Sequence, residues 1–280
     1  MQAKIWIMVR LAVGVFGAKN ASAQFTVLSD FENRFSTNIL GGYWYMYDDK
    51  NDSGESVLTT VDSITHSWDT TTFAEGAEGS PSSAKMGFLL GNRPPVCGAA
   101  CTYPPMVGMG TKLGNSGTMN LTGATAVSFW AKGDSPMNVS FTVGTSEVTD
   151  NGNYAILIPV TSAWTKFTVA LPPAADLKQP GWAKKIDFNP VYASSLGWSI
   201  SKGDNTGLVS GAFYLDYVVI EGWKPPEDPA SLASRRNRAG AAAGFRGTKS
   251  NGTLFFTTDP NRSRYLDALG RGMAPTPHPR

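Results

Sequence analysis

Carboxylates are the side chains in this 280-residue chain that could break a glycosidic bond. Glycosidases need two carboxyl groups several ångströms apart, one acting as acid and the other as nucleophile or base. The candidates stand in polar segments: Asp48, Asp49, Glu55, Asp69, Glu147 and Asp150. Solvated loop carboxylates explain each of them more simply. A small secreted β-glucanase is therefore an alternative, and a non-catalytic protein is the first interpretation.

Other catalytic chemistry lacks its usual residues. The chain has two histidines, His66 and His278, and His66 lies in a polar stretch without a nucleophile-elbow motif. Neither a Gly-rich phosphate loop nor a dinucleotide fingerprint occurs. These observations argue against serine hydrolases and nucleotide-dependent enzymes.

A row of aromatic residues in GGYWYMYDD is the strongest sign of a binding surface. In a strand, Tyr43, Tyr45 and Tyr47 share one face, while Trp44 and Met46 share the other. One face packs in the core and the other meets water or a ligand. Flat rings suit the apolar faces of sugar rings, and polar neighbours suit their hydroxyls. A strand buried on both faces is the alternative, and it would make the chain a structural surface or adhesion protein whose aromatic residues belong to the core.

Oxygen-bearing side chains lie near both ends of the same region. Asp30 and Glu32 stand in an opening DFE segment, and Asp216 stands in a closing YLD segment. Carboxylates in flexible loops suit Ca²⁺, although DDKNDSG does not have the spacing of an EF-hand loop. We expect a structural calcium that joins the first and last strands, with a plain acidic loop as the alternative.

The two cysteines, Cys97 and Cys101, stand in CGAAC. An oxidising compartment would allow a small-loop disulfide between them. A zinc site is excluded because the chain lacks the further Cys or His ligands that such a site needs. We therefore expect a disulfide.

Strands must position these residues. Charged residues make up 16% of the chain, and Gly, Pro, Ser and Thr are abundant. Segments of period-two alternation or apolar character, bounded by turn residues, predict strands. The predicted strands are 25–32, 43–47, 84–91, 126–133, 138–145, 154–160, 164–171, 195–201 and 213–223. This pattern predicts an all-β fold, a β-sandwich of the jelly-roll kind.

The N-terminus indicates export. Residues 1–23 combine a basic start, the short apolar run LAVGVFGA and small residues before Gln24, which is the pattern of a cleaved signal peptide. The apolar run is too short to span a bilayer, and no later segment is long enough either. A buried first helix is the alternative. We expect a secreted or cell-surface protein.

The mature chain divides into three parts. Residues 24–223 predict the sandwich, 224–247 a flexible linker rich in Pro, Ala, Ser and Arg, and 248–280 a short C-terminal extension. Residues 224–280 carry ten Lys or Arg against four Asp or Glu. Because these arginines are scattered among Gly, Ala and Ser, we do not expect nucleic-acid binding.

Several segments between residues 25 and 223 together resemble bacterial carbohydrate-binding modules. They are DFE, GGYWYMYDD, LTGATAVSFWAKGD, VTSAWTKFTVAL, DLKQPGWA and FYLDYVVIEG. The pattern is similar to family 11 and to related galactose-binding-like β-sandwiches. The resemblance implies a jelly roll whose concave face binds a β-glucan, either mixed-linkage β-1,3-1,4-glucan or cellulose. It also implies structural calcium and, as partners, glycoside hydrolases at the cell surface.

The resemblance also implies particular site residues. Carried over by position, the carbohydrate-binding residues are Tyr45, Tyr47, Tyr103, Tyr154, Gln179 and Trp182. The implied calcium ligands are Glu32 and Asp216. The segment SLGWSIS departs from the family, because Ser199 and Ile200 stand where a tyrosine or another polar residue is often found.

The C-terminal segment GTLFFTTDPNRSRYLDALGRGM is similar to sorting domains of the type IX secretion pathway. It predicts two or three strands around a DPN turn. The closing basic strand of those domains is replaced here by APTPHPR, so the tail resembles an incomplete sorting domain.

Overall fold

The computed structural model describes residues 24–61, 68, 72–93, 103–173 and 176–225, together with the backbone of four short strands between residues 248 and 273. The chain divides into two compact units, Met1–Lys224 and Pro225–Arg280. Strands and short 3-10 turns make up the regular structure of the described residues, and none of these residues is in an α-helix. The predicted all-β class is confirmed.

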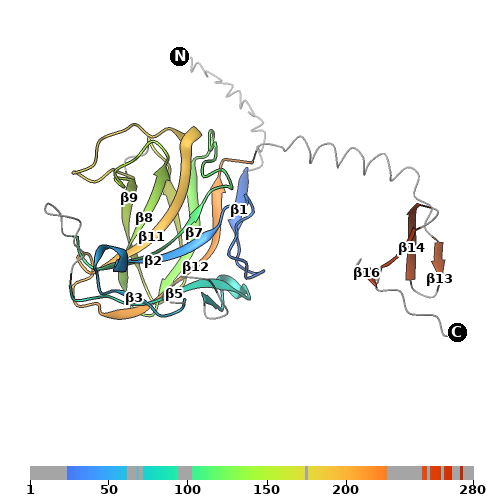
Figure 1. The fold of residues 1–280 in the computed structure, drawn as a ribbon, viewed down its shortest axis with the longest axis horizontal. Helices are drawn as coiled ribbons and strands as arrows, with labels where there is room; N and C mark the ends of the chain where they lie inside the picture. Colours follow the sequence, from blue (N-terminus) through green and yellow to red (C-terminus); the bar gives the residue numbers. More distant parts are fainter. Residues whose placement is uncertain are drawn as a thin grey trace, which may run out of the picture. The chain divides into compact units, whose positions relative to one another are not determined.

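One sheet of the first unit has five antiparallel strands in the order β2-β6-β11-β8-β9 (Figure 1). Its strands are β2 (Trp44–Asp48), β6 (Met106–Lys112), β8 (Met137–Thr145), β9 (Tyr154–Val160) and β11 (Ala193–Ser201). The central strand is β11, and β2 and β9 form the two edges.

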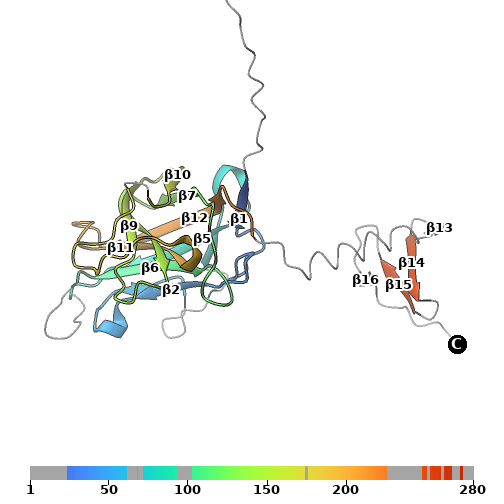
Figure 2. The same ribbon diagram turned by 90° about the horizontal axis from the view of Figure 1, so that it is seen from above.

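The other sheet has seven strands, with the order β10-β7-β12-β5-β3 and two further strands paired to it. Its strands are β1 (Phe25–Ser29), β3 (Val57–Leu58), β4 (Phe73–Ala74), β5 (Ser83–Leu89), β7 (Ala126–Gly133), β10 (Thr165–Ala170) and β12 (Ser210–Glu221). One edge of β12 pairs with β5 over residues 210–215 and with β1 over residues 218–221. The two sheets lie as separate layers (Figure 2).

The core fills the space between the two layers. Trp198 of β11, Phe141 of β8 and Phe129 of β7 meet there with ring centroids 5.2–5.3 Å apart. All three side chains are fully buried. The predicted alternation in β7 is confirmed, because Val127, Phe129 and Ala131 all face this core. Aromatic packing across the two sheets therefore holds the sandwich together.

The structure contains one long strand, β6, that the sequence did not predict. Gly108 and Gly110 interrupt the apolar pattern of residues 106–112, so this segment was not among the predicted strands. Val107, Met109 and Thr111 nevertheless alternate with these glycines and are fully buried. The short 3-10 turns are Lys50–Asp52, Ala77–Gly79 and Pro190–Tyr192.

The second unit contains a four-stranded antiparallel sheet whose strands follow one another in chain order. They are β13 (Thr248–Ser250), β14 (Thr253–Asp259), β15 (Arg262–Leu266) and β16 (Gly272–Met273). The two predicted strands on either side of the DPN turn are confirmed. A sorting role for this unit stays a prediction, and the predicted signal peptide at 1–23 lies outside the described residues. Within the described part of the chain, no helix has the length and hydropathy needed to cross a membrane.

Candidate functional site

The tyrosines of β2 lie on the face of the five-stranded sheet that points away from the core. Trp44 and Met46 are 3% and 2% exposed and pack inside the sandwich. Tyr45 and Tyr47 are half-buried on the opposite face, and Tyr43 is 54% exposed beside them. Neighbouring ring centroids are 5.9 and 6.1 Å apart. The predicted division of this strand into two faces is confirmed, and we call this outward surface the tyrosine face.

Two glycines of β6 let the tyrosine rings lie across the sheet. Tyr45 pairs with Gly110, and Tyr47 pairs with Gly108. A β-carbon added to Gly108 would lie 2.3 Å from Cζ of Tyr47, and one added to Gly110 would lie 2.8 Å from the Tyr45 hydroxyl oxygen. A side chain at position 108 would displace the Tyr47 ring, and one at position 110 would press on both the Tyr45 hydroxyl and the Leu196 carbonyl oxygen. Glycine inside a strand weakens it, and such a glycine often marks a site of close approach.

Serines of β11 lie near the far ends of the rings. The Ser195 side chain interacts with the Tyr45 hydroxyl and the Ser199 side chain with the Tyr47 hydroxyl, and each interaction lowers the pKa of its tyrosine. Burial raises the pKa of both tyrosine hydroxyls above their ordinary value, and each has a second contribution from the neighbouring tyrosine. Both phenols are therefore neutral at physiological pH. Their rings lie over β6, and both side chains are partly exposed.

The floor beside the tyrosines consists of small and hydroxyl-bearing residues. Ser195 and Ser199 alternate with Gly197 on β11, and the next strand contributes Thr142 and Gly144. The Thr142 and Ser195 hydroxyls lie over Gly197 and Gly144, where added β-carbons would come within 2.6 and 2.4 Å of them. Five strands at a spacing of about 4.8 Å make a floor about 19 Å wide. This floor offers hydroxyls beside flat rings.

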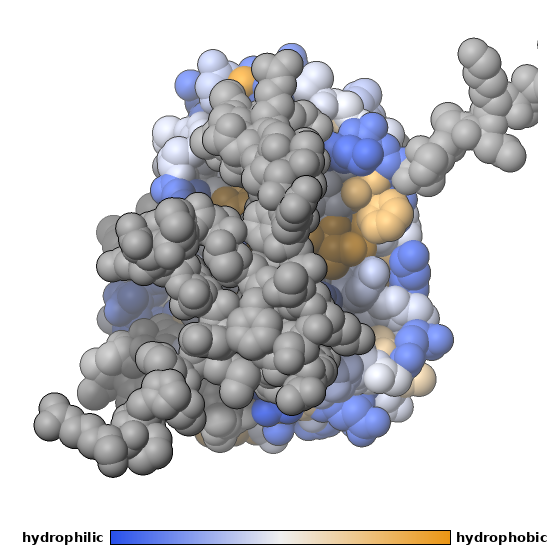
Figure 3. Space-filling model, turned by 90° about the vertical axis from the view of Figure 1, so that its right-hand side faces the viewer, coloured by the Kyte–Doolittle hydropathy of each residue, from blue (hydrophilic) through white to orange (hydrophobic). Residues whose placement is uncertain are grey.

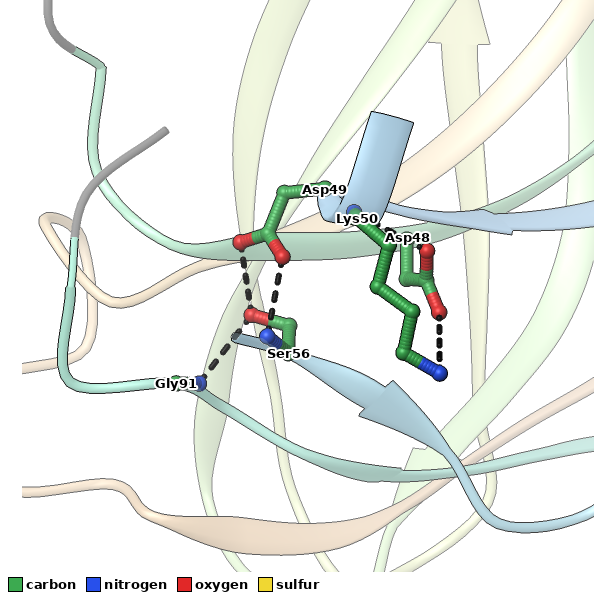
Figure 4. Close-up of polar contacts among 5 residues, drawn as sticks. All are labelled: Asp48, Asp49, Lys50, Ser56 and Gly91. Atoms are coloured by element: carbon green, nitrogen blue, oxygen red, sulfur yellow. Dashed lines mark hydrogen bonds and ion pairs between the residues drawn. The ribbon is translucent and has the colours of Figure 1, made fainter. Parts of the chain in front are cut away.

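The acidic loop after β2 has a structural role at its centre. Asp49 is 2% exposed, and its Oδ1 and Oδ2 accept hydrogen bonds from the Ser56 amide and hydroxyl at 2.8 and 2.7 Å (Figure 4). The Gly91 amide donates to the Ser56 hydroxyl at 3.1 Å, and the Met106 amide donates to Asp49 Oδ2 at 3.0 Å. Asp49 therefore ties the loop to the start of β6 and is unsuited to acid–base catalysis.

Tyr103 lies next to this loop. Its hydroxyl forms a hydrogen bond with the Asp52 side chain, and burial followed by the Asp52 and Asp49 carboxylates raises the pKa of Tyr103 to about 12. Asp48, at the end of β2, forms an ion pair with Lys50 at 3.5 Å (Figure 4). The structure thus places Tyr103 beside the loop that follows Tyr47.

Two of the predicted carbohydrate-binding residues are not on the tyrosine face. Tyr154 is 7% exposed on the core side of β9, where its hydroxyl donates to the Ile186 carbonyl. Gln179 is 9% exposed and bonds the Gly152 carbonyl and the Ile186 amide, each at 2.8 Å. Both side chains hold the 176–188 loop against the sandwich. They support the loop and do not contact a ligand on the tyrosine face.

Trp182 stands on that same loop and is 69% exposed. The loop pairs with the β9 edge through two hydrogen bonds between Lys178 and Ala155, at 3.0 and 3.1 Å. The tyrosines lie at the β2 edge of the same sheet. The loop that carries Trp182 and the tyrosines therefore lie at opposite edges of the five-stranded sheet.

The predicted calcium ligands occupy different environments. Asp216 is fully buried, and its Oδ2 and Oδ1 accept hydrogen bonds from the Ala77 and Tyr217 amides at 2.9 and 2.7 Å. Burial, with a contribution from Asp30, raises the pKa of Asp216 to about 6. Glu32 is exposed. Among the described residues no group of three or more acidic, His or Cys side chains gathers in one place.

These carboxylates do not by themselves make up the ligand shell of a calcium ion. Two carboxylates, Asp216 and Asp30, carry negative charge in a buried region, which suits a cation, but calcium takes six to eight oxygens. The residues that fit are therefore Asp216 and Asp30, and backbone carbonyls or water would have to complete the shell. Cys97 and Cys101, the predicted disulfide pair, lie outside the described residues.

Comparison with known proteins finds similarity to one curated sequence over part of its length and to several solved structures. No family model matches the chain. It is 23% identical over 197 residues to Endoglucanase 3 of Fibrobacter succinogenes, a match that covers 70% of this chain and 27% of that protein. The chain thus spans about a quarter of the length of this relative.

Solved structures with a similar arrangement include carbohydrate-binding modules of two families. A family 11 module from Clostridium thermocellum, in complex with a β-1,3-1,4-mixed-linked tetrasaccharide, is 13% identical, with a TM-score of 0.44 and coverage of 72% of this chain and 98% of that chain. The family 11 module of Lic26A-Cel5E from the same organism is 15% identical, with a TM-score of 0.46 and coverage of 74% and 100%. A family 29 module complexed with cellohexaose is 13% identical, with a TM-score of 0.36 and coverage of 74% and 100%.

Proposed function

We propose that residues 24–223 form a non-catalytic module that binds a glycan chain on the tyrosine face. The observation that carries the proposal is the position of the Tyr45 and Tyr47 rings, which lie over Gly110 and Gly108 with serine side chains near their hydroxyls. A preorganised ring loses little conformational freedom when a ligand stacks on it. The apolar face of a sugar ring fits such a surface, and its hydroxyls find partners among the Ser and Thr side chains.

A β-glucan is the ligand we propose, either a mixed-linkage β-1,3-1,4-glucan or cellulose. The sequence resemblance to family 11 modules and the similarity to part of Endoglucanase 3 support this choice. Binding at the surface of an insoluble or long-chain polysaccharide raises the local concentration of any enzyme held nearby. We propose that glycoside hydrolases are those partners and that the protein acts outside the cell.

Native affinity electrophoresis of the full chain tests this function. The gels contain mixed-linkage β-glucan, hydroxyethylcellulose, xylan or no polysaccharide. We expect retardation in a β-glucan gel and no release of reducing ends afterwards. Release of reducing ends, abolished by changing one carboxylate, would favour the glucanase alternative. Unchanged mobility in every gel would overturn the glucan assignment.

We also propose that Asp216 and Asp30 contribute to a structural calcium site. The unbalanced negative charge around the buried Asp216 carboxylate supports this. Thermal unfolding in calcium and in excess EGTA tests it. We expect the melting temperature to fall by several degrees in EGTA, and to respond less in an Asp30→Asn variant. Equal melting temperatures in calcium and EGTA would contradict the site without affecting the proposal for the tyrosine face.

A further inference from the structure

A hollow of about 460 Å³ lies on the opposite side of the sandwich, on the outward face of the seven-stranded sheet. It forms where β1 takes the place of β5 beside β12. The lining residues that matter here are Phe25, Ser128, Lys166, Tyr217, Val219 and Glu221. Figure 3 shows the side of the molecule where β1 lies, with an apolar patch bordered by hydrophilic residues.

Tyr217 is held at the rim of the hollow by an unusual backbone. The pairing of β12 with β7 shifts between Asp216 and Val219, as in a β-bulge, and Tyr217 lies there with a φ of +48°. Its amide donates to Oδ1 of its neighbour Asp216 at 2.7 Å. A left-handed backbone is unfavourable for a bulky residue, and bulges often redirect a side chain at functional sites. The Tyr217 side chain is 45% exposed.

Ser128 provides an unsatisfied polar group at the same place. It is 1% exposed, and its hydroxyl has no hydrogen-bond partner within the described structure. A buried hydroxyl without a partner is costly, and each one calls for an explanation such as an unseen ligand or water. Ser128 belongs to the lining of the hollow. A ligand hydroxyl could therefore satisfy it.

Charge and rings indicate the class of ligand. One cation, Lys166, and one anion, Glu221, contribute to the lining, so the hollow has no excess of either sign. Two exposed aromatic side chains, Phe25 at 56% and Tyr217 at 45%, supply apolar surface. The volume lies in the range of small-molecule sites.

We propose that this hollow is a second glycan site, which binds one or two neutral sugar residues. Tyr217 and Phe25 supply apolar contact, and Ser128, Lys166 and Glu221 bind hydroxyls. The proposal does not depend on the tyrosine face, which belongs to the other sheet. Two sites on opposite faces would let one module bridge two polysaccharide chains.

Amide chemical-shift mapping of the ¹⁵N-labelled full chain tests the proposal. Cellobiose, xylobiose and mannobiose are added separately to a Tyr45→Ala variant, which removes the contribution of the tyrosine face. Concentrations up to about 50 mM detect millimolar affinity. We expect one of these sugars to move the amides of Ser128, Tyr217 and Glu221 in a saturable way.

Two variants and a control make the test specific. Tyr217→Asn removes the ring but tolerates the left-handed backbone, so we expect a folded protein that has lost the response. Ser128→Ala should raise the Kd for the sugar by about 3- to 10-fold without lowering the melting temperature of the free protein. Tyr192→Asn removes a tyrosine of similar exposure, 43%, and should leave the response unchanged. The proposal is overturned if no sugar moves these amides, or if the shifts persist unchanged in Tyr217→Asn.

Discussion

Two groups of aromatic rings on opposite faces of the sandwich have different surroundings: the tyrosine face, and the Trp164–Tyr214 pair of the seven-stranded sheet. On the seven-stranded sheet, Lys132 Nζ lies 4.9 Å from the ring centroids of both Trp164 and Tyr214, and Lys85 Nζ lies 5.9 Å from that of Tyr214. On the tyrosine face, the Tyr45 and Tyr47 rings lie over glycines, and serine side chains lie near their hydroxyls. Aromatic content alone therefore does not mark a binding surface. What matters is whether the ring faces already have partners from the protein itself.

We expect the largest loss of glucan affinity when a ring is removed from the tyrosine face. Tyr45→Ala should weaken β-glucan affinity by about 30-fold, the scale of a strong interface residue. Because the side chain is half-buried, unfolding free energy should fall by about 1–2 kcal/mol. Titration calorimetry and chemical denaturation of the same sample measure the two quantities. A variant that unfolds while its residual folded fraction binds normally would make the tyrosines structural.

A second change keeps the tyrosine and removes its support. Gly108→Ala places a methyl group where the Tyr47 ring now lies, so the ring must lift from β6. We expect affinity to fall by about tenfold and stability by about 1–3 kcal/mol, because the packed site must rearrange.

A matched strand glycine provides the control for this change. Gly211→Ala on β12 adds a methyl group only 3.4 Å from the Phe88 ring, which is an ordinary contact. It should leave affinity unchanged. Equal losses of affinity in Gly108→Ala and Gly211→Ala would mean that the position of the Tyr47 ring is irrelevant to binding.

On the seven-stranded sheet, removing a ring should lower stability and leave glucan affinity nearly unchanged. Tyr214→Ala removes the ring beside Lys132 and a hydrogen bond to Asp134 at 2.8 Å. We expect a loss of about 1 kcal/mol of stability and β-glucan affinity within about twofold of the parent. Denaturation and calorimetry again measure both. A large loss of affinity would show that the cation-covered rings also bind glucan.

The smallest expected effect concerns the loop at the β9 edge. Asp150 accepts hydrogen bonds from the Lys184 and Gly152 amides at 2.8 and 2.9 Å, and these bonds lower the pKa of Asp150 below its ordinary value of 3.8. A lowered folded-state pKa gives stability that is present above pH 3.8 and lost as the pH falls through the folded-state value.

Asp150→Asn should therefore lower the melting temperature slightly at pH 7, and the difference should disappear in strong acid. Thermal scans from neutral to acid pH measure this, with Asp176→Asn as an exposed carboxylate control. A difference that grows toward low pH would contradict the role assigned to these two hydrogen bonds.

The sequence was sufficient to predict the strands whose side chains alternate. Strands such as β7 and β8 carry an alternating pattern, and the two faces of β2 were predicted correctly. Strand β6 was missed because its outward positions are glycines, which resemble turn residues in a sequence. The regular spacing of Val107, Met109 and Thr111 was the signal that could have found it.

The site was predicted only in part, because its geometry depends on register between distant strands. Tyr45 and Tyr47 follow from their own strand, but their partners Ser195 and Ser199 are about 150 residues away. Only the alternation in SLGWS suggested an outward polar face there. Tyr154 was assigned by resemblance to a position, and the pairing of β9 with β8 places it on the core side.

The central claim is that a glucan lies on the tyrosine face, and amide shift mapping with a mixed-linkage β-1,3-1,4-tetrasaccharide tests it most directly. Gly108, Gly110 and Ser195 give amide signals on the floor beneath the proposed ligand. We expect saturable shifts centred on these amides, with the midpoint of the titration moved to an about 30-fold higher ligand concentration in Tyr45→Ala. Shifts that spare these amides, or that saturate at the same concentration in Tyr45→Ala, would contradict the claim.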